Sequence, residues 1–319
     1  MNLVIKLSFL LFLVVSFTQV SGQNDKNKPN KKTSKKEIRA TFNGEFKELA
    51  ITGKTKNGAV WLRWSPYSQS AWDKGNEFGY TLTRMQVSNN KMVELFKRRK
   101  PQPEAFWRKK VEEKDQKYMT TAYSIYGHND DKERKITNLL DAIEDANTRF
   151  MFALLGADIS FEVASNAGLG YIDSTAKLGE TYIYTLSIEV TRANVGKVKS
   201  ASSKPIIFGK IIKLPPPLLS AKSGKNVAVL EWDTKKMTEY YNSYILERSE
   251  NPSDTFKQIN DGTLLNATEE EDFKKVYIDT LADHKTVHYY RVKGIDIFED
   301  QGEYSNVVKA RDCFLNCVK

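Results

Sequence analysis

The sequence predicts a mainly β chain built from two antiparallel β-sandwiches, the first of which carries an inserted α-helical hairpin. Short segments of alternating apolar and polar residues recur in the same order in the two halves, as in half-buried strands. A long segment found only in the first half has helical spacing of its apolar residues. The length of 319 residues suits two domains, and a hydrophobic share of 40% is enough to give each domain a core.

The repeat begins with a strand that contains tryptophan. The segment AVWLRWSP at 59–66 is echoed by VAVLEWDT at 227–234. Three further pairs follow in the same order: YTLTR at 80–84 with YILER at 244–248, YID at 171–173 with YID at 277–279, and YIYTL at 182–186 with HYYRV at 288–292. The spacing from the YID segment to the last segment is the same in both copies, which indicates that one kind of domain occurs twice.

The second copy shows the strand pattern most clearly. Ala228, Leu230 and Trp232 fall on one face of their strand, and Tyr290 and Val292 fall on one face of theirs. Glycine, proline, asparagine and aspartate separate the strands, as expected of tight turns. Short strands spaced in this way across 215–310 are typical of a β-sandwich.

These segments resemble the fibronectin type III family, whose domains are immunoglobulin-like sandwiches. In that family a buried tryptophan lies on strand B, an aromatic residue begins strand C, and a tyrosine at the start of strand F closes the E–F corner. Trp232, Tyr244 and the HYYRV segment fit these places. The resemblance implies such domains at 39–213 and 214–311. His288 stands where the first copy has Tyr182, and Tyr289 could take the corner role only by a one-residue slip that reverses the faces.

The first copy is longer because it places residues 85–170 where the second needs only 249–276. We expect a first helix from Pro103 to a stop at Gly127, a polar turn at 128–134, and a second helix from Ile136 that runs on through 157–164 to Gly168 or Gly170. The apolar stripe of the first helix contains Trp107, Val111, Tyr118, Ala122 and Ile125, and that of the second contains Ile136, Leu139, Leu140, Ile143, Phe150, Met151 and Leu154. The hairpin therefore occupies about 98–168, between strands C and E.

Three motifs make the first domain similar to that of secreted fibronectin type III proteins of the Bacteroidota, which carry a helical insert. The motifs are RW-x-P at 63–66, AW…N-x-x-GY at 71–80 and AGLG-Y-x-D at 167–173. This resemblance implies an envelope or surface protein, and not an enzyme.

The two ends of the chain indicate export. Residues 1–22 form an apolar signal peptide with one charge, Lys6, cleaved after Gly22 or Gln23; the alternative is an uncleaved membrane anchor. Residues 23–38 form a basic flexible tether without the interleaved aromatics of a nucleic-acid arm, so we expect no nucleic-acid partner. The mature chain, without a transmembrane segment, would be in the periplasm, at the cell surface or secreted. In the tail at 312–319, Cys313 and Cys317 are disulfide candidates, with each other or with another chain.

The search for chemistry finds no catalytic residues, metal site or cofactor motif. The histidines are His128, His284 and His288. The last two are four residues apart, which in a strand is too far to share a metal. The acidic runs at 130–131 and 269–272 lie in predicted loops, and a sandwich offers no deep cleft for paired carboxylates.

Aromatic and basic residues near the B–C loop and the first helix are the candidate partner-binding set. They are Trp72, Phe78, Trp107, Tyr118, Tyr123 and Tyr126, flanked by Arg98, Arg99 and Arg108. The rings would pack the helices onto the sandwich, anchor a protein partner or stack on sugars. The leading hypothesis is a non-enzymatic extracytoplasmic binding or scaffold protein that recognises a protein partner through the insertion and adjacent loops. The alternative is a carbohydrate-binding accessory component of a polysaccharide-processing system.

Overall fold

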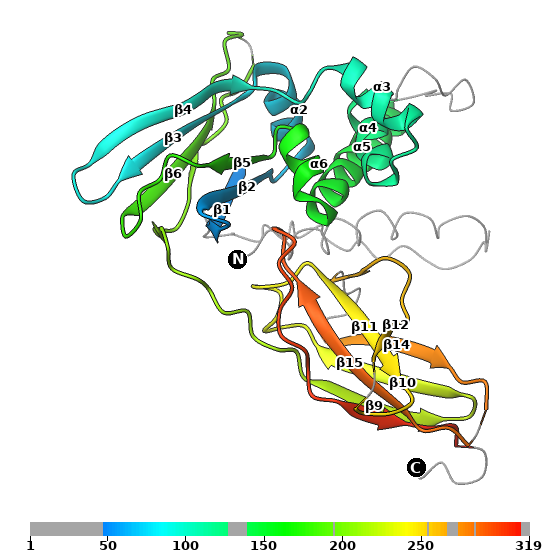
Figure 1. The fold of residues 1–319 in the computed structure, drawn as a ribbon. Helices are drawn as coiled ribbons and strands as arrows, with labels where there is room; N and C mark the ends of the chain where they lie inside the picture. Colours follow the sequence, from blue (N-terminus) through cyan, green and yellow to red (C-terminus); the bar gives the residue numbers. More distant parts are fainter. Residues whose placement is uncertain are drawn as a thin grey trace, which may run out of the picture.

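The computed structural model describes residues 47–126, 139–193, 195–253, 255–266, 274–283 and 285–313. The predicted signal peptide and tether, together with His128, His284 and Cys317, lie outside the described residues. Two β-sandwiches follow one another along the chain, and an extended connector links them (Figure 1).

The first sandwich has one sheet in the order β1-β2-β5 and a second in the order β4-β3-β6-β7, with β8 also paired to β6. Its strands are β1 (Leu49–Lys56), β2 (Ala59–Pro66), β3 (Tyr80–Gln86), β4 (Lys91–Arg99), β5 (Gly170–Asp173), β6 (Thr181–Ile188), β7 (Ala201–Ser202) and β8 (Ile206–Ile207). All pairs are antiparallel. The register of β3 and β4 shifts on both sides of Leu82, and Arg98 has a φ of 52° there, so β4 is bulged.

The second sandwich repeats this plan with a sheet in the order β14-β10-β9 and another in the order β12-β11-β15-β16, with β13 also paired to β11. Its strands are β9 (Leu219–Gly224), β10 (Val227–Asp233), β11 (Ser243–Ser249), β12 (Lys257–Gln258), β13 (Leu264–Leu265), β14 (Lys274–Thr280), β15 (His288–Ile295) and β16 (Val308–Ala310). Strands A, B and E are β1, β2 and β5 in the first copy and β9, β10 and β14 in the second; strands C, F and G are β3, β6 and β7 in the first copy and β11, β15 and β16 in the second. In both copies the sheet of strands A, B and E faces the sheet that contains strands C, F and G, which is the strand arrangement of a fibronectin type III sandwich. The predicted fold class is confirmed.

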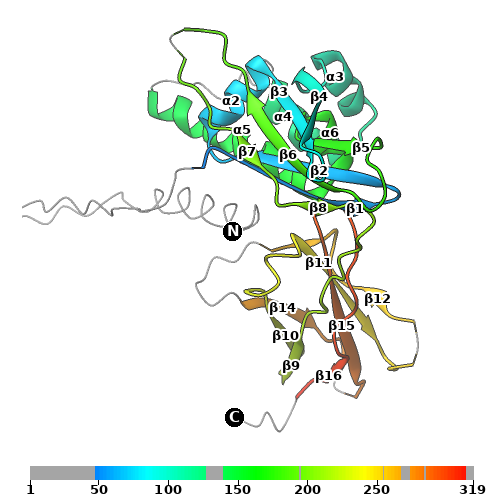
Figure 2. The same cartoon turned by 90° about the vertical axis from the view of Figure 1, so that its left-hand side faces the viewer.

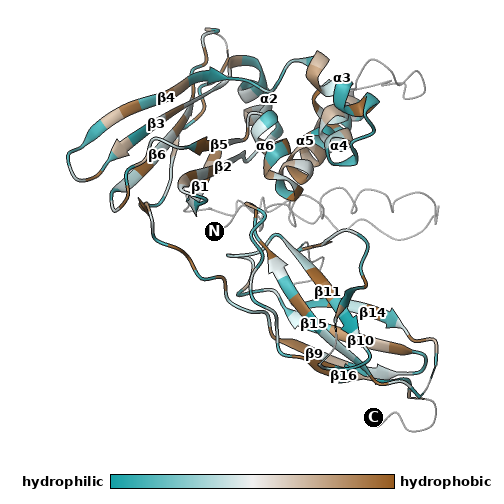
Figure 3. Cartoon of the chain, viewed as in Figure 1, coloured by the Kyte–Doolittle hydropathy of each residue, from teal (hydrophilic) through white to brown (hydrophobic). Residues whose placement is uncertain are grey.

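Each core lies between its two sheets, on the faces that the sequence pattern predicts. Apolar and polar residues alternate along the strands of both sandwiches (Figure 3). Ala228, Leu230 and Trp232 are buried, as are Tyr290 and Val292. The rings of Trp232 and Tyr244 are 5.4 Å apart and nearly perpendicular, an arrangement that stabilises aromatic pairs.

The tyrosine corner of the first copy is formed by Tyr182, as the resemblance implies: its hydroxyl accepts from the Lys177 backbone amide in the E–F connection at 3.0 Å. In the second copy His288 is buried at this position, and Tyr289 does not take its place, since it lies on the other face of β15.

Two positions further along, Tyr184 and Tyr290 also lie on the buried faces of β6 and β15. Each hydroxyl donates to the carboxylate that ends the YID segment, Tyr184 to Asp173 at 2.9 Å and Tyr290 to Asp279 at 2.8 Å.

An arginine from strand C completes this group in both copies. Arg84 donates to Asp173 at 2.7 Å, and Arg248 donates to Asp279 at 2.9 Å. We call each arginine, aspartate and tyrosine set the sheet-joining triad, because the aspartate lies in one sheet and its two donors lie in the other. Burial by itself raises the pKa of Asp173, but hydrogen bonds from Thr175, Arg84 and Tyr184 lower it below its ordinary value.

The helical part of the first domain differs in detail from the predicted hairpin. The helices are α2 (Gln69–Phe78), α3 (Glu104–Glu112), α4 (Gln116–Tyr126), α5 (Leu139–Ile159) and α6 (Phe161–Asn166). The first expected helix is broken where Lys114 adopts a φ of 54°, and the second where the Ser160 hydroxyl caps α6. The predicted start at Ile136 lies outside the described residues. Figures 1 and 2 show these helices gathered beside β2 and β5.

The helix α2 occupies the B–C connection, where the sequence pattern predicts a loop. The Ser68 hydroxyl caps its first turn by accepting from the Ala71 amide. Gly79 ends it with a φ of 81°, and a Cβ there would lie 2.4 Å from the backbone of Arg98. Only glycine fits this close approach between α2 and β4.

Replacement of Asp173 by alanine should lower the free energy of unfolding of the first sandwich by about 3–5 kcal/mol, because it leaves a half-buried arginine and a buried tyrosine without their shared acceptor. Chemical denaturation followed by circular dichroism would measure the change. The exposed Asp261→Ala is the matched control and should stay within about 0.5 kcal/mol of the parent protein. Equal effects of the two substitutions would contradict a stabilising role of the triad.

Candidate functional site: the helical insertion and the domain junction

Three of the nine predicted partner-binding residues are core residues. Trp72, Trp107 and Tyr118 are at most 3% exposed. The Trp107 indole donates to the carbonyl of Gln102 at 2.9 Å, and its ring lies 5.8 Å from that of Tyr118. These rings pack the helices onto the sandwich, so they have no surface left for a partner. This is the packing alternative that the sequence left open.

The other aromatic members lie at different depths. Tyr123 on α4 is 47% exposed. Phe78 and Tyr126 are half-buried against the core of the first domain, and the Tyr126 hydroxyl donates to the carbonyl of Gln102. Of these rings, Tyr123 therefore presents the most surface to solvent.

The three arginines do not form one basic patch. Arg108 pairs with Glu104 on its own helix, and Arg98 lies 3.5 Å from Glu189. The guanidinium of Arg99 is half-buried over the rings of Phe96 and Tyr171. The structure thus spreads the nine predicted residues over the core, the helix surface and the edge of β4, and does not bring them together as one site.

A buried ion pair fixes the insertion to the sandwich. Arg63 on β2 is fully buried, and it donates to the carboxylate of Asp158 on α5 at 3.0 Å. The same guanidinium donates to the backbone carbonyls of Trp64 and Leu169. Burial lowers the pKa of Arg63 and raises that of Asp158, and the attraction between the two groups opposes both shifts. Loss of either partner would leave an uncompensated charge in the core.

The insertion also reaches the second domain. The Asn242 side chain, in the B–C connection of the second sandwich, donates to the backbone carbonyl of Asp158. Phe161 of α6 lies between two rings, with centroids 4.5 Å from Trp61 on β2 and 5.8 Å from Phe298 in the second domain. The end of α5 and the start of α6 therefore form part of the domain junction.

Two lysines of β1 complete this junction. Lys54 pairs with Asp296 and Asp300, and Lys56 pairs with Asp300 at 2.7 Å. Lys56 also donates to the carbonyl of Phe298. Burial alone would raise the pKa of Asp300, but the two ammonium groups lower it below its usual value. The paired charges and the tilted rings together make a defined contact between the domains.

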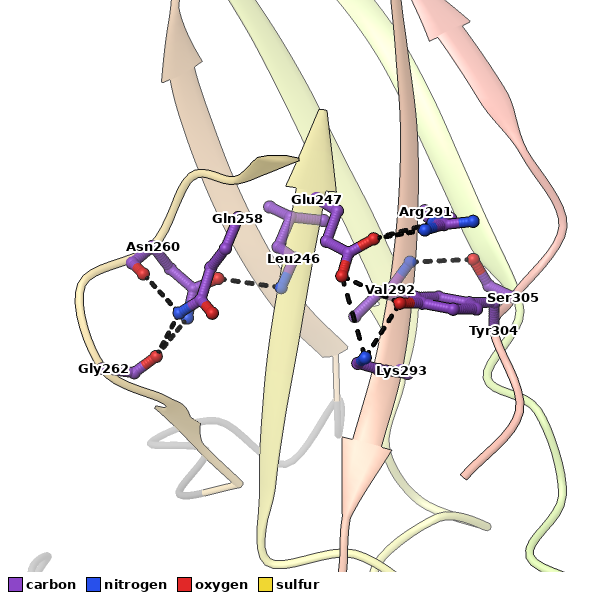
Figure 4. A network of polar contacts seen from close by, with 10 residues as sticks. All are labelled: Leu246, Glu247, Gln258, Asn260, Gly262, Arg291, Val292, Lys293, Tyr304 and Ser305. Carbon is purple, nitrogen blue, oxygen red and sulfur yellow. Dashed lines mark hydrogen bonds and ion pairs between the residues drawn. The ribbon is translucent and has the colours of Figure 1, made fainter. Parts of the chain in front are cut away.

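A second polar cluster covers the outer face of β11 and β15 (Figure 4). The carboxylate of Glu247 accepts from Arg291 at 2.8 Å and from the Tyr304 hydroxyl at 2.9 Å. Lys293 donates to the same hydroxyl, and the Arg291 guanidinium lies 3.6 Å from the centre of the Tyr304 ring. Since each polar group here satisfies another, the cluster stabilises the sheet.

The described residues give no sign of a metal centre. Among them, no group of three histidine, cysteine, aspartate or glutamate side chains is placed to hold an ion. His288 is buried beside Tyr290. Cys313 is disulfide-bonded, whereas Cys317 lies outside the described residues. No helix in the described part of the chain has the length and apolar character needed to span a membrane.

Sequence reasoning missed the residues of the domain junction. Arg63 and Asp158 are far apart in the chain, and Lys54 and Lys56 alternate with uncharged residues in the manner of any exposed strand. One available signal was the placement of Arg63 between Leu62 and Trp64, where a charge would be expected to have a buried partner.

No protein-family model matches the chain, and no curated protein matches it. Among solved structures, the chicken interferon gamma receptor alpha chain is 10% identical, with a TM-score of 0.29 over 82% of this chain and 96% of that one. An Fn3-like protein from Clostridium thermocellum is 20% identical, with a TM-score of 0.26 over 33% of this chain and 99% of that one. The FN1–FN3 domains of chicken contactin are 10% identical, with a TM-score of 0.32 over 83% of this chain and 63% of theirs. Scores this low add nothing to the strand order that defines the two sandwiches.

Replacement of Trp107 by alanine should destabilise the first domain by about 3–5 kcal/mol, because it removes a large ring from a packed core. Tyr123→Ala, on the exposed side of the insertion, should cost less than about 1 kcal/mol. Thermal and chemical unfolding would measure both. A destabilisation by Tyr123→Ala as large as that by Trp107→Ala would contradict the assignment of these rings to core and surface.

Acid should loosen the domain junction. Because the folded-state pKa of Asp300 is lowered, its ion pairs contribute fully above the ordinary aspartate pKa of about 3.9 and are lost as the pH falls through the lower folded value. Small-angle X-ray scattering should therefore give constant dimensions from pH 7 to about pH 4 and larger ones below. The Asp300→Asn variant should already show the larger dimensions at pH 7. An Asp300→Asn profile that matches that of the parent protein would argue against the lysine–aspartate contact.

Proposed function

We propose that this chain is a non-enzymatic, extracytoplasmic binding or scaffold protein that recognises a protein partner through the outer surface of its helical insertion. One observation carries the proposal. The insertion is fixed to the sandwich by a buried ion pair, and it still exposes large apolar side chains. They are Val111, Met119, Tyr123, Ile143, Phe152 and Ile159.

Rigid apolar side chains suit recognition of a protein. Single exposed apolar residues are common on any surface, but aromatic and methionine side chains are enriched in protein interfaces. A surface held by the core loses little conformational entropy when a partner binds. The junction with the second domain extends this rigidity along the molecule, as a scaffold requires.

The disulfide at Cys313 supports a place outside the cytoplasm, since disulfides persist in oxidising compartments. It agrees with export by the predicted signal peptide. A carbohydrate-binding role is less favoured, because Trp72 and Trp107, the two rings best suited to stack on sugars, are buried.

Site-specific photo-cross-linking in the native cells tests the proposal. A photoreactive phenylalanine analogue in place of Tyr123 should cross-link a defined protein. The same analogue in place of Tyr240, which is 37% exposed in the second domain, is the matched control and should not. Removal of the whole insertion would be a poor test, because it would leave Arg63 buried without Asp158.

A point substitution provides the second arm. Met119→Glu places a charge on the exposed apolar surface of α4 and should reduce the cross-link from position 123 at least about tenfold. Met92→Glu, on β4 outside the insertion, should leave it unchanged. A cross-link of equal yield from position 240, or one insensitive to Met119→Glu, would contradict recognition through the insertion.

A further inference from the structure

We propose that the open end of the first sandwich binds an oxyanion of the sulfate or phosphate class. A small hollow there is lined by six polar or charged residues and one valine: Arg84, Gln86, Lys91, Val93, Thr175, Lys177 and Tyr182. It lies in the sandwich and not in the helical insertion, so this inference is independent of the proposed function.

The hollow arises because the two sheets have unequal lengths. The strand β5 ends at Asp173, whereas β3 and β4 continue past it (Figure 1). Tyr184, opposite Arg84, is still covered by Asp173. One step further along, Gln86 pairs with Lys91 on one side and with Tyr182 on the other. Strand β5 does not extend over the row formed by Lys91, Gln86 and Tyr182, so the hollow opens at that row.

The lining carries an excess of positive charge. None of the described residues that line it is acidic. The charge of Arg84 is balanced by Asp173, but Lys91 and Lys177 form no ion pair with the described part of the chain. Of the nearby carboxylates, Glu180 accepts from Ser88 and stays outside the lining. The lining therefore includes two exposed lysines whose charge no described carboxylate balances.

Neutral donors add direction to this charge. The Tyr182 hydroxyl accepts from the Lys177 amide at 3.0 Å, which leaves its own proton to donate to a ligand. Thr175 is already held between Arg84 and Asp173 and positions the guanidinium. The cavity volume of about 90 Å³ holds several water molecules, so it can accept one tetrahedral anion.

The second sandwich shows that this charge is not needed for folding. It has the same sheet-joining triad and the same spacing between its YID segment and strand F. At the positions that correspond to Gln86 and Lys177 it carries Glu250 and Asp283, and His288 replaces Tyr182. The second sandwich forms the same triad with acidic residues at this end. The lysines of the first copy are therefore not required by the fold, and anion binding would account for them.

Nuclear magnetic resonance titration of the full mature chain at low ionic strength tests the site. Sodium sulfate and sodium phosphate, against sodium chloride at matched ionic strength, should shift amide signals saturably and only near residues 84–93 and 174–182. Lys91→Gln and Lys177→Gln should each weaken binding about tenfold, because each removes charge-assisted hydrogen bonds. Lys177→Asp, which copies the second sandwich, should abolish it.

Lys222→Gln, on the exposed surface of β9, is the matched control and should leave the affinity unchanged. The lysine variants should keep well-dispersed spectra, since Lys91 and Lys177 are exposed. The proposal is overturned if chloride produces the same shifts, if the shifts spread over the surface, or if the lysine variants bind sulfate normally. Sodium acetate binding as tightly as sulfate would overturn the assignment of the ligand class.

Discussion

The carboxylate of Asp173, and that of Asp279 in the second copy, joins the two sheets of each sandwich through one arginine and one tyrosine. A buried carboxylate is costly unless donors surround it. Its arginine comes from strand C and its tyrosine from strand F, so a slip of one residue in any of the three strands would leave it unsatisfied. This constraint explains why spacing and residue type agree between two copies that otherwise differ widely.

The helical insertion uses the same principle on a larger scale. Arg63 joins β2 to α5, and the backbone of Asp158 then contacts Asn242 of the second domain. The insertion thus contacts both sandwiches and also exposes an outer surface of its own. The recognition proposed for its outer side and the rigidity of the junction would depend on the same packed helices, so the two properties would be physically coupled.

Local patterns were enough to predict the sandwiches, because strand alternation depends on neighbouring residues. The faces of Trp232 and Val292 follow from the period of two. The corner at Tyr182 follows from its place at the start of its strand, whereas the contacts of Tyr184 and Tyr290 with the aspartates cross the sandwich and leave no local pattern. The breaks at Lys114 and Ser160 are single-residue events that a helical stripe does not reveal. The sequence leaves open whether the aromatic set belongs to the core or to the surface, and only the packing of α3 and α4 places Trp107 and Tyr118 on the inward face. Contacts such as Arg63 with Asp158 link distant segments and leave no local pattern at all.

The bulged strand β4 has a consequence for the behaviour of this chain at high concentration. As the outermost strand of its sheet, it presents unpaired backbone groups along nine residues. Such an edge invites a second chain to add a strand and start an aggregate. Four lysine and arginine side chains lie along it, and the left-handed Arg98 interrupts its regular ladder. Like charges and an irregular backbone should therefore prevent strand pairing between neighbouring molecules and protect the chain from self-association at high concentration.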